Sequence, residues 1–261
     1  MIWCILFCFY ISLSFSIQRS IECSAEPQKN YPFCNPDLDI DTRVDDFVSR
    51  LTLDECASLL NSESPAIEHL GVRPYDWRSN CLHGWGWWGR TTDWRDLRWQ
   101  NFPMPVGLGA TFNPRLIKKV ADVTAKEGRA LHNMILEFYN GTTPEAGGLN
   151  CFSPNINLIR DPRWGRNMEV FSEDPYLTTI LGGVYTFSLQ QKVDGYYMLA
   201  ASPKHFAVHS GPDSSRLSFV ANATEHDLYE FFLPQFETQT RCLNALEIMP
   251  AYSFFFFTAV I

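Results

Sequence analysis

The stretch FSPNINLIRDPRWGRNMEVFSEDPYL (residues 152–177) joins a predicted strand to a predicted helix. The apolar run Leu149–Phe152, which leads into it, is typical of a buried strand. Asp174-Pro175 near its end predicts a helix start, because an Asp side chain can accept from free amide groups and proline fits the first helical position. The apolar residues that follow recur at helical spacing: Leu177, Ile180, Leu181 and Val184.

The same alternation of strand and helix recurs along the chain. Helix starts are predicted at residues 113–114 and 224–227, and short apolar runs at 196–201 and 245–249 are typical of strands. Strands that alternate with helices pair in parallel, because each crossover returns the chain to the same edge of the sheet. The chain has 261 residues, close to the roughly 250 of one barrel domain. We therefore predict an α/β fold, either an open sheet or a barrel.

Polar residues follow the predicted strands directly. Ser153–Asn157 comes after the first apolar run, Lys204-His205 after the second, and Pro250–Ser253 after the third. In a parallel α/β fold the loops at the carboxyl ends of the strands build the active site. The sequence therefore predicts a functional site made from these three segments.

The charge balance argues against a nucleic-acid partner. Lys and Arg number 21 against 29 Asp and Glu, which gives a formal net charge of −8, and no run of basic residues occurs. A protein that binds through phosphate contacts carries a basic patch. We expect no nucleic-acid partner.

Tryptophan is crowded into one segment. Six of the 8 Trp lie between Trp77 and Trp99. Flat apolar faces with a polar edge suit sugars, which are polar at the rim and rich in C–H groups on their faces. The alternative is a Trp-rich edge of the core, which we expect for about half of them.

The N-terminal segment is typical of a secretory leader. Residues 2–17 are almost wholly apolar and are shorter than the roughly 20 residues of a membrane span. We predict a signal peptide over residues 1–25, a secreted or lumenal protein, and no membrane contact after cleavage. Sequons at Asn140 and Asn222 predict N-glycosylation. The cysteines form no CxxC pair, and their pairing is left open.

Arg166 is the strongest candidate for a ligand-binding residue in the 152–177 stretch. Its guanidinium group can hold two neighbouring hydroxyls of a sugar, because it presents paired donors. The alternative is a network of structural ion pairs that fixes a long loop. We expect that role for Arg160, Asp161 and Glu173.

Lys204 and His205 form a second candidate cluster. Adjacent side chains in extended backbone point to opposite sides unless a bend redirects one of them. His205 and His209 have the spacing of a zinc motif, but the sequence HFAVH has no Glu to act as base. We therefore expect no zinc at these residues, and the chain has neither a nucleophile elbow nor a Walker phosphate-binding loop.

The chain resembles the N-terminal barrel domain of glycoside hydrolase family 3, in its β-xylosidase-like branch. The matching segments run in family order over nearly all of the predicted mature chain. They are FCN (33–35), RVDDFVSRLTLDE (43–55), YDWRSNCLHG (75–84), FPMPVGLGATFNP (102–114), EGRALHN (127–133), SPNINLIRDPRWGR (153–166), EDPYL (173–177), SPKHFAVHSGP (202–212) and TEHDLYEFFLPQFE (224–237).

This resemblance implies an α/β fold, a TIM-type (β/α)8 barrel. It also implies an exo-acting retaining glycosidase that removes terminal β-linked xylose, or arabinose or glucose, from oligosaccharides. That chemistry needs no metal and no organic cofactor. In such enzymes an Asp attacks the anomeric carbon and a second carboxyl group protonates the leaving oxygen. The resemblance implies that Arg166, Lys204 and His205 bind hydroxyls of the terminal sugar. It places Arg216 on the substrate side and Tyr252 beside the nucleophile.

Two departures from the family pattern affect the expected site. Asn80 stands where the family has a carboxylate that holds sugar hydroxyls, so a charge-assisted hydrogen bond is lost. The nucleophilic Asp is expected beyond Ile261, so no catalytic residue is assigned within this chain. We expect a barrel domain over residues 26–253, incomplete at its C-terminal end, an aberrant hydrophobic tail over 254–261, and a chain that is inactive by itself.

The sequence is also compatible with two other functions. The first is a non-catalytic secreted sugar-binding protein that keeps the Arg166, Lys204 and His205 pocket without the chemistry. The second is a structural or partner protein in which another chain completes the open edge of the barrel. Sugar binding by a folded chain favours the first, and a stable hetero-oligomer favours the second.

Overall fold

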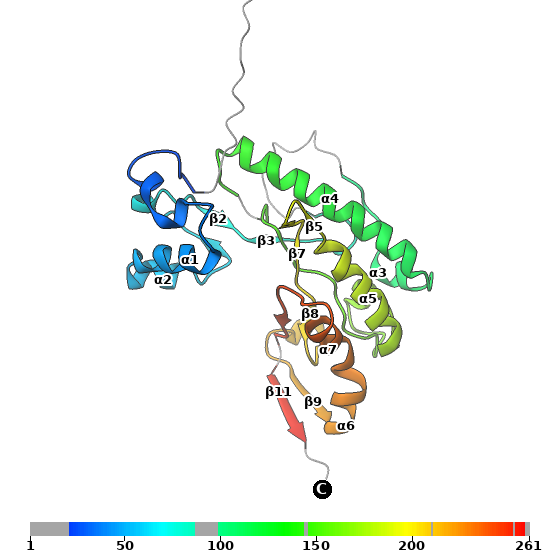
Figure 1. The fold of residues 1–261 in the computed structure, drawn as a ribbon. Coiled ribbons are helices and arrows are strands. Elements are labelled where there is room, and N and C mark those ends of the chain that lie inside the picture. Colours follow the sequence, from blue (N-terminus) through cyan, green and yellow to red (C-terminus); the bar gives the residue numbers. More distant parts are fainter. Residues whose placement is uncertain (1–20, 87–98, 144–145, 210, 253, 259–261) are drawn as a thin grey trace, which may run out of the picture.

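The computed structural model describes residues 21–86, 99–143, 146–209, 211–252 and 254–258, in which short strands meet two long helices (Figure 1). The helices are α1 (Ile40–Ser49), α2 (Leu53–Ser58), α3 (Pro105–Gly109), α4 (Pro114–Phe138), α5 (Pro175–Leu189), α6 (Glu225–Asp227) and α7 (Pro234–Arg241). The strands are β1 (Glu63–Ser64), β2 (Tyr75–Asp76), β3 (Arg78–Ser79), β4 (Asn150–Cys151), β5 (Lys192–Val193), β6 (Tyr196–Tyr197), β7 (Ala200–Ala201), β8 (Lys204–Phe206), β9 (Val220–Thr224), β10 (Met249–Pro250) and β11 (Phe254–Thr258).

Parallel pairing dominates the strands that lie next to the long helices. β3, β4 and β7 form one parallel sheet in that order, with Ser79 opposite Cys151 and Cys151 opposite Ala201. β8 pairs in parallel with β10, and β9 with β11. The antiparallel pairs are β1–β2 and β5–β6. The predicted parallel α/β arrangement is therefore confirmed.

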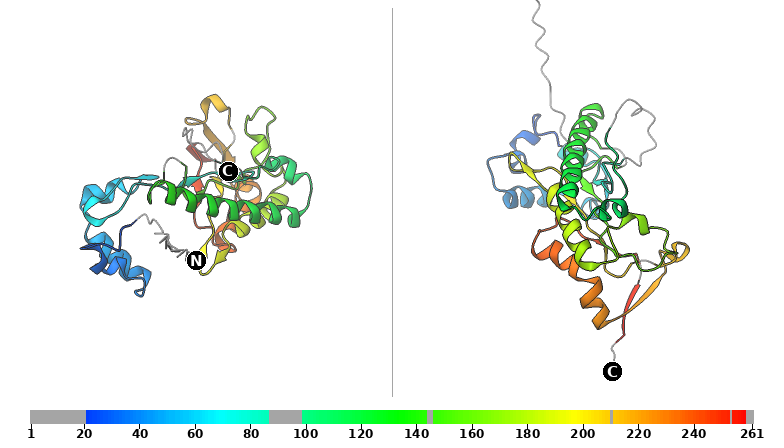
Figure 2. Two further views of the ribbon diagram at one scale, coloured as in Figure 1. Left: turned by 90° about the horizontal axis from the view of Figure 1, so that it is seen from above. Right: turned by 90° about the vertical axis from the view of Figure 1, so that its right-hand side faces the viewer.

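The helices α4 and α5 pack against each other and form one layer over the parallel strands (Figures 1 and 2). Each starts as predicted: the Asn113 side chain accepts from Leu116 N at 3.1 Å, and Asp174 accepts from Leu177 N. The main core cluster joins residues of both helices to buried residues of the strands. Its members include Ile117, Val120, Leu131, Ile135, Leu181, Tyr185, Cys151 and Ala201. Burial of each large aliphatic side chain stabilises this layer by about 1.5–3 kcal/mol.

Two predicted strands differ from the structure in their extent. The run at 196–201 is not one strand: its first part closes the β5–β6 hairpin around Gly195 at φ 84°, and β7 begins only at Ala200. Of the run at 245–249, only Met249 is in a strand, since β10 spans Met249–Pro250. In both runs the apolar pattern continues beyond the residues that form ladder hydrogen bonds.

Residues 21–86 include a small N-terminal lobe with a core of its own. Phe33, Ile67 and Leu70 are buried there, next to α1 and α2. A disulfide joins Cys23 to Cys34, and the Glu22 backbone N–H donates to Gly71 O at 2.9 Å. The signal-peptide boundary at residue 25 stays a prediction, and these contacts favour an earlier cleavage point. No helix among the described residues is long and apolar enough to cross a membrane.

The other predicted segments have these places in the structure. Asn140 is exposed after the end of α4, and Asn222 is exposed in β9, so both sequons are accessible on this chain. Part of the segment predicted as an aberrant tail is β11, which pairs with β9 from Phe254 to Thr258. Of the crowded tryptophans, Trp85 is buried in the core and packs edge-on against Trp99 at 5.7 Å, while residues 87–98 lie outside the described residues. The role of Trp85 is therefore the structural one.

A second disulfide, Cys81–Cys151, crosslinks the segment after β3 to β4 within the main core. Both cysteines are fully buried and 70 residues apart in sequence. A crosslink that closes a loop of this length lowers the entropy of the unfolded chain. The disulfide also fixes the position of Cys81, which directly follows Asn80 in the chain.

Replacing both Cys81 and Cys151 with Ala is expected to lower the free energy of unfolding by roughly 4 kcal/mol, the loop-closure value for such a separation. Urea unfolding of the oxidised protein measures it. Cys242→Ala is the matched control, since Cys242 is exposed and in no disulfide, and its unfolding midpoint should not move. Equal urea midpoints for the double variant and the wild type would contradict a stabilising disulfide between Cys81 and Cys151.

Candidate functional site

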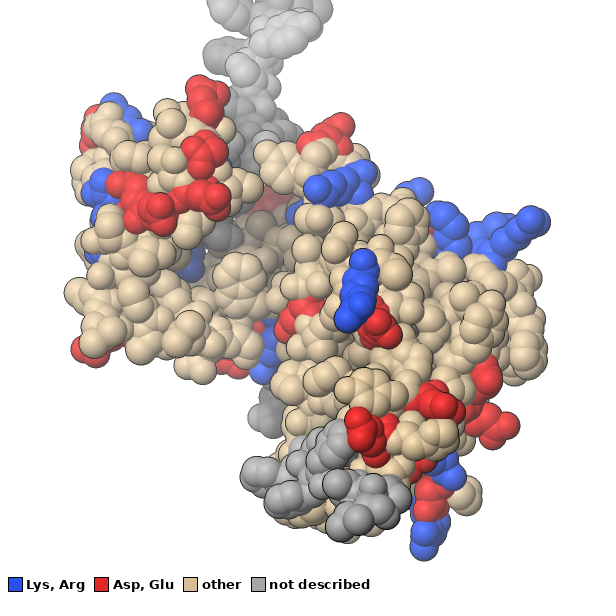
Figure 3. All heavy atoms as spheres, turned by 60° about the horizontal axis from the view of Figure 1, so that its bottom comes forward, with Lys and Arg blue, Asp and Glu red and all other residues tan. Residues whose placement is uncertain are grey.

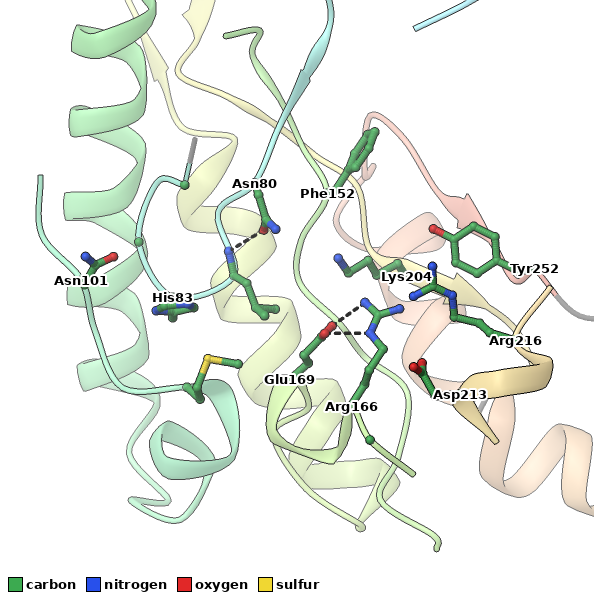
Figure 4. A pocket seen from close by; sticks show the side chains of 15 residues that line it. Asn80, His83, Asn101, Phe152, Arg166, Glu169, Lys204, Asp213, Arg216 and Tyr252 are labelled. Atoms are coloured by element: carbon green, nitrogen blue, oxygen red, sulfur yellow. Dashed lines mark hydrogen bonds and ion pairs between the residues drawn. The ribbon is translucent and has the colours of Figure 1, made fainter. Parts of the chain in front are cut away.

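A cavity of about 690 Å³ opens at the carboxyl ends of the parallel strands (Figure 4). Asn80 follows β3 directly, Lys204 belongs to β8, and Tyr252 follows β10. Arg166 and Glu169 reach the cavity from a short 3-10 turn in the loop that follows β4. The cavity therefore lies where the alternating strand and helix pattern predicts it.

Five of the six residues predicted to bind sugar line this one cavity. They are Asn80, Arg166, Lys204, Arg216 and Tyr252. The sixth, His205, is fully buried one layer behind, where its ring contacts Arg166. The fold thus brings together residues from five separate segments, and their roles toward a sugar stay predictions.

Arg166 forms a bidentate ion pair with Glu169. Its Nε donates to Oε1 at 2.7 Å and its Nη2 donates to Oε2 at 2.6 Å. Burial raises the pKa of Glu169, but the hydrogen bonds and charge of Arg166 outweigh burial, so the pKa stays below its ordinary value. Since a guanidinium carries five N–H donors, Arg166 keeps donors free for a ligand.

His205 is held in one tautomer by Asn157. The Asn157 side-chain NH2 donates to the backbone oxygens of His205 and Ala207, so its Oδ1 is an acceptor. His205 Nδ1 lies 2.9 Å from that oxygen and must therefore carry the proton. Its Nε2 is then an acceptor, 3.4 Å from Arg166 Nη1. Burial strongly lowers the pKa of His205, which keeps the ring neutral.

Lys204 is a buried cation that faces the same ion pair. Its side chain is only 5% exposed, and no described residue accepts a hydrogen bond from its ammonium group. Burial lowers the pKa of Lys204 to about 8, while the charge of Glu169 raises it and that of Arg166 lowers it. His205 contacts Arg166, and Lys204 interacts electrostatically with both members of the ion pair, so two adjacent residues of β8 act on this pair.

An aromatic wall closes the cavity beside β10. The Tyr252 ring lies 5.6 Å from the ring of His205 and 5.9 Å from that of His209. Arg216 stacks over Tyr252 with its guanidinium carbon 5.2 Å from the ring centre. Tyr252 is half-exposed, so one of its faces is open to a ligand.

Asn80 presents its amide at the opposite side of the cavity. Its Oδ1 accepts from Leu82 N at 3.1 Å and from Ser153 Oγ at 3.3 Å. No described residue accepts from its Nδ2, which Figure 4 shows on the side of the cavity. Asn80 therefore offers donors to a ligand at a position where a carboxylate offers only acceptors.

Sequence reasoning did not assign several residues that build this site. Glu169 and Asn157 hold Arg166 and His205 in place, and Asp213 and His83 line the cavity. Glu169 and Asn157 lie in the 152–177 stretch, so its density of polar residues was the available signal. His83 lies in the YDWRSNCLHG segment that carries the family resemblance.

The described residues contain no group of three or more His, Cys, Asp or Glu side chains that could hold a metal ion. His205 and His209 lie close together, with ring centres 4.3 Å apart. His205, however, uses Nδ1 for Asn157 and Nε2 for Arg166.

On the face of Figure 3, basic and acidic side chains are dispersed among other residues, and the described Lys and Arg form no continuous patch on that face.

The arrangement defines a class of protein: a parallel α/β fold with a cavity at the strand ends that is lined by Arg and Lys donors and an aromatic side chain. Comparison with known proteins specifies the family. The model of the glycosyl hydrolase family 3 N-terminal domain matches residues 86–256. A xylan 1,4-β-xylosidase of Xylanibacter ruminicola is 40% identical over 248 residues, which cover 94% of this chain and 27% of that protein.

Two further matches agree. The β-xylosidase/α-L-arabinofuranosidase 2 of Medicago sativa subsp. varia is 36% identical over 86% of this chain and 29% of its own length. The solved structure of a family 3 exo-β-xylosidase bound to a xylobiose aziridine probe superposes with a TM-score of 0.77 and 27% identity, over 92% of this chain and 30% of that one. The chain belongs to glycoside hydrolase family 3 and spans less than a third of the length of these relatives. The predicted TIM-type α/β class is confirmed.

The buried histidines predict a loss of stability in mild acid. Burial lowers the pKa of His132 and of His209 from 6.5 to about 4, and it lowers that of His205 further. The unfolded chain therefore binds protons below pH 6.5 that the folded chain does not. Each such histidine lowers the free energy of unfolding by about 1.4 kcal/mol per pH unit, from pH 6.5 down to its folded pKa.

Urea unfolding at a series of pH values between 7 and 5 measures this slope. His132→Asn is expected to reduce it by one proton, because His132 Nδ1 bonds only to Gly147 O and stands outside the cavity. The exposed His226 supplies the matched control, since His226→Asn should leave the slope unchanged. A pH-independent free energy of unfolding over this range would contradict neutral burial of the three rings.

Proposed function

We propose that this chain is the sugar-binding barrel of an exo-acting retaining β-xylosidase, which removes terminal β-linked xylose from xylo-oligosaccharides. One observation carries the proposal: the partly buried Arg166 and the buried Lys204 line one cavity, and both have donors that no described residue uses. Vicinal sugar hydroxyls offer a matching row of acceptors. The named relatives and the solved neighbour support xylose as the sugar.

Binding energy in such a site comes from donors that are already aligned. Glu169 fixes two of the guanidinium donors of Arg166, and His205 contacts a third, so those that remain point in set directions. Lys204 adds a charged donor from β8, and the open face of Tyr252 can pack on the C–H face of a sugar ring. A preorganised cation costs little reorganisation when a polar ligand binds.

The covalent chemistry requires a carboxylate that is free to attack. Glu169 cannot serve, because both of its oxygens accept from Arg166. We propose that the nucleophile and the acid come from outside the described residues, as the family resemblance implies.

We also propose that the protein is secreted and glycosylated. The apolar segment 2–17 supports a cleaved leader, and the exposure of Asn140 and Asn222 supports both sequons. The disulfides Cys23–Cys34 and Cys81–Cys151 agree with an oxidising compartment. The Cys23–Cys34 disulfide supports cleavage before Cys23, since removal of Cys23 would leave Cys34 without this partner.

Arg166→Lys is expected to weaken binding of methyl β-xyloside at least roughly tenfold, because a lysine cannot hold Glu169 and a sugar with a planar fork. Isothermal titration calorimetry measures the affinity. Arg163→Lys is the matched control: Arg163 lies three residues earlier, has a side chain that is 88% exposed, and pairs with Asp161. Equal affinities in wild type and Arg166→Lys would overturn the proposed role of Arg166.

Hydrolysis of an aryl β-xyloside distinguishes a β-xylosidase from a non-catalytic sugar-binding protein. Turnover by the complete protein supports the β-xylosidase. Tight binding without turnover by the complete protein indicates the non-catalytic sugar-binding protein. If a folded chain binds no xyloside, the proposed function is wrong.

A further inference from the structure

Asn80 faces the cavity with a donor that no described residue uses. Its Oδ1 accepts from the Leu82 backbone N–H at 3.1 Å and from Ser153 Oγ at 3.3 Å. These two bonds occupy both lone pairs of the amide oxygen. Its Nδ2 lies on the side of the cavity (Figure 4). Residue 80 can therefore donate a hydrogen bond to a ligand but has no acceptor left for one.

Neighbouring backbone groups fix the orientation of this amide. The Cys81 backbone N–H donates to Ser153 Oγ at 3.4 Å, so the proton of the Ser153 hydroxyl is left for Asn80. The Gly86 backbone N–H donates to Asn80 O at 2.6 Å, which holds the main chain. Turning the amide by 180° would set its NH2 group against the Leu82 N–H, with two donors facing each other. The donor is thus kept toward the cavity.

This donor lies in the same cavity as the cations of the proposed sugar site. Asn80 lines it together with Arg166 and Lys204. The two sides are connected, because the Lys204 backbone N–H donates to Pro154 O at 3.0 Å and the preceding residue, Ser153, donates to Asn80. A sugar hydroxyl can either accept a hydrogen bond or donate one. The residue at position 80 therefore decides which of the two a hydroxyl does there.

We propose that Asn80 is a specificity-determining residue of the sugar site, whose Nδ2 donates to one hydroxyl oxygen of the terminal xylose. The carboxylate that the family resemblance places at this position can only accept, so it requires the proton of that hydroxyl. Asn80 does not require this proton, and the site therefore tolerates a sugar that carries an acceptor without a proton at that carbon. The inference rests on the proposed function, because it describes one contact of the same neutral sugar.

Deoxyfluoro sugars test the direction of this hydrogen bond, since fluorine is close to a hydroxyl in size, accepts weakly and cannot donate. Calorimetry of the full chain with methyl β-xyloside and its 2-, 3- and 4-deoxyfluoro derivatives measures the affinity lost at each carbon. At one carbon we expect this loss to be at least roughly tenfold larger in Asn80→Asp than in wild type, because the carboxylate finds no proton to accept. Asn133→Asp makes the same change on the exposed face of α4 and should leave all three losses unchanged.

Monodeoxy derivatives test the same contact without a change of charge, and they keep the inference testable if Asn80→Asp does not fold. Asn80→Ala is expected to weaken binding of methyl β-xyloside about fivefold, the effect of losing one neutral hydrogen bond. It should weaken two of the three monodeoxy xylosides by the same factor. The affinity of the third, which lacks the oxygen that Asn80 contacts, should not change.

Two outcomes overturn the inference and leave the proposed function intact, since methyl β-xyloside still binds in both. One is an equal loss at each of the three carbons in wild type and in folded Asn80→Asp. The other is a uniform effect of Asn80→Ala on methyl β-xyloside and on all three monodeoxy derivatives. A folded wild-type chain that binds no methyl β-xyloside overturns the proposed function itself, and the inference with it.

Discussion

The partly buried ion pair between Arg166 and Glu169 is the interaction on which the site depends. The charge of Glu169 offsets the repulsion between Arg166 and the neighbouring Lys204. Loss of Glu169 would therefore leave two like charges side by side. The pair also fixes the direction of the Arg166 donors, so stability and ligand recognition rest on the same contact.

The parallel strands give this pair its surroundings. β8 carries Lys204 and His205, and Asn157 ties His205 to the loop that also presents Arg166. On the other side, the Cys81–Cys151 disulfide and the Ser153 hydroxyl hold Asn80 beside the end of β4. Hydrogen bonds or the neighbouring disulfide thus hold Asn80, Arg166 and His205 in position. Tyr252 and Arg216 stack on each other at another edge of the cavity.

Local signals predicted the helices well. Asn113-Pro114 and Asp174-Pro175 start α4 and α5 because the capping side chain and the fixed φ of proline act within four residues. Strand limits were less predictable: apolar runs extend past the residues that pair, as the β5–β6 turn within 196–201 shows. The residue at which a strand ends depends on partner strands that are distant in sequence. The apolar pattern of the strand itself does not reveal those partners.

The sequence by itself determined the alternation of strand and helix, the helix starts, and the polar segments at the ends of the strands. Those properties follow from neighbouring residues. Only the tertiary structure decided that Asn157 orients His205 across 48 residues, that Cys81 pairs with Cys151, and that Glu169 neutralises Arg166 beside Lys204. These contacts arise when separate strands meet in one sheet, and the desolvation that gives them their strength exists only in the folded core.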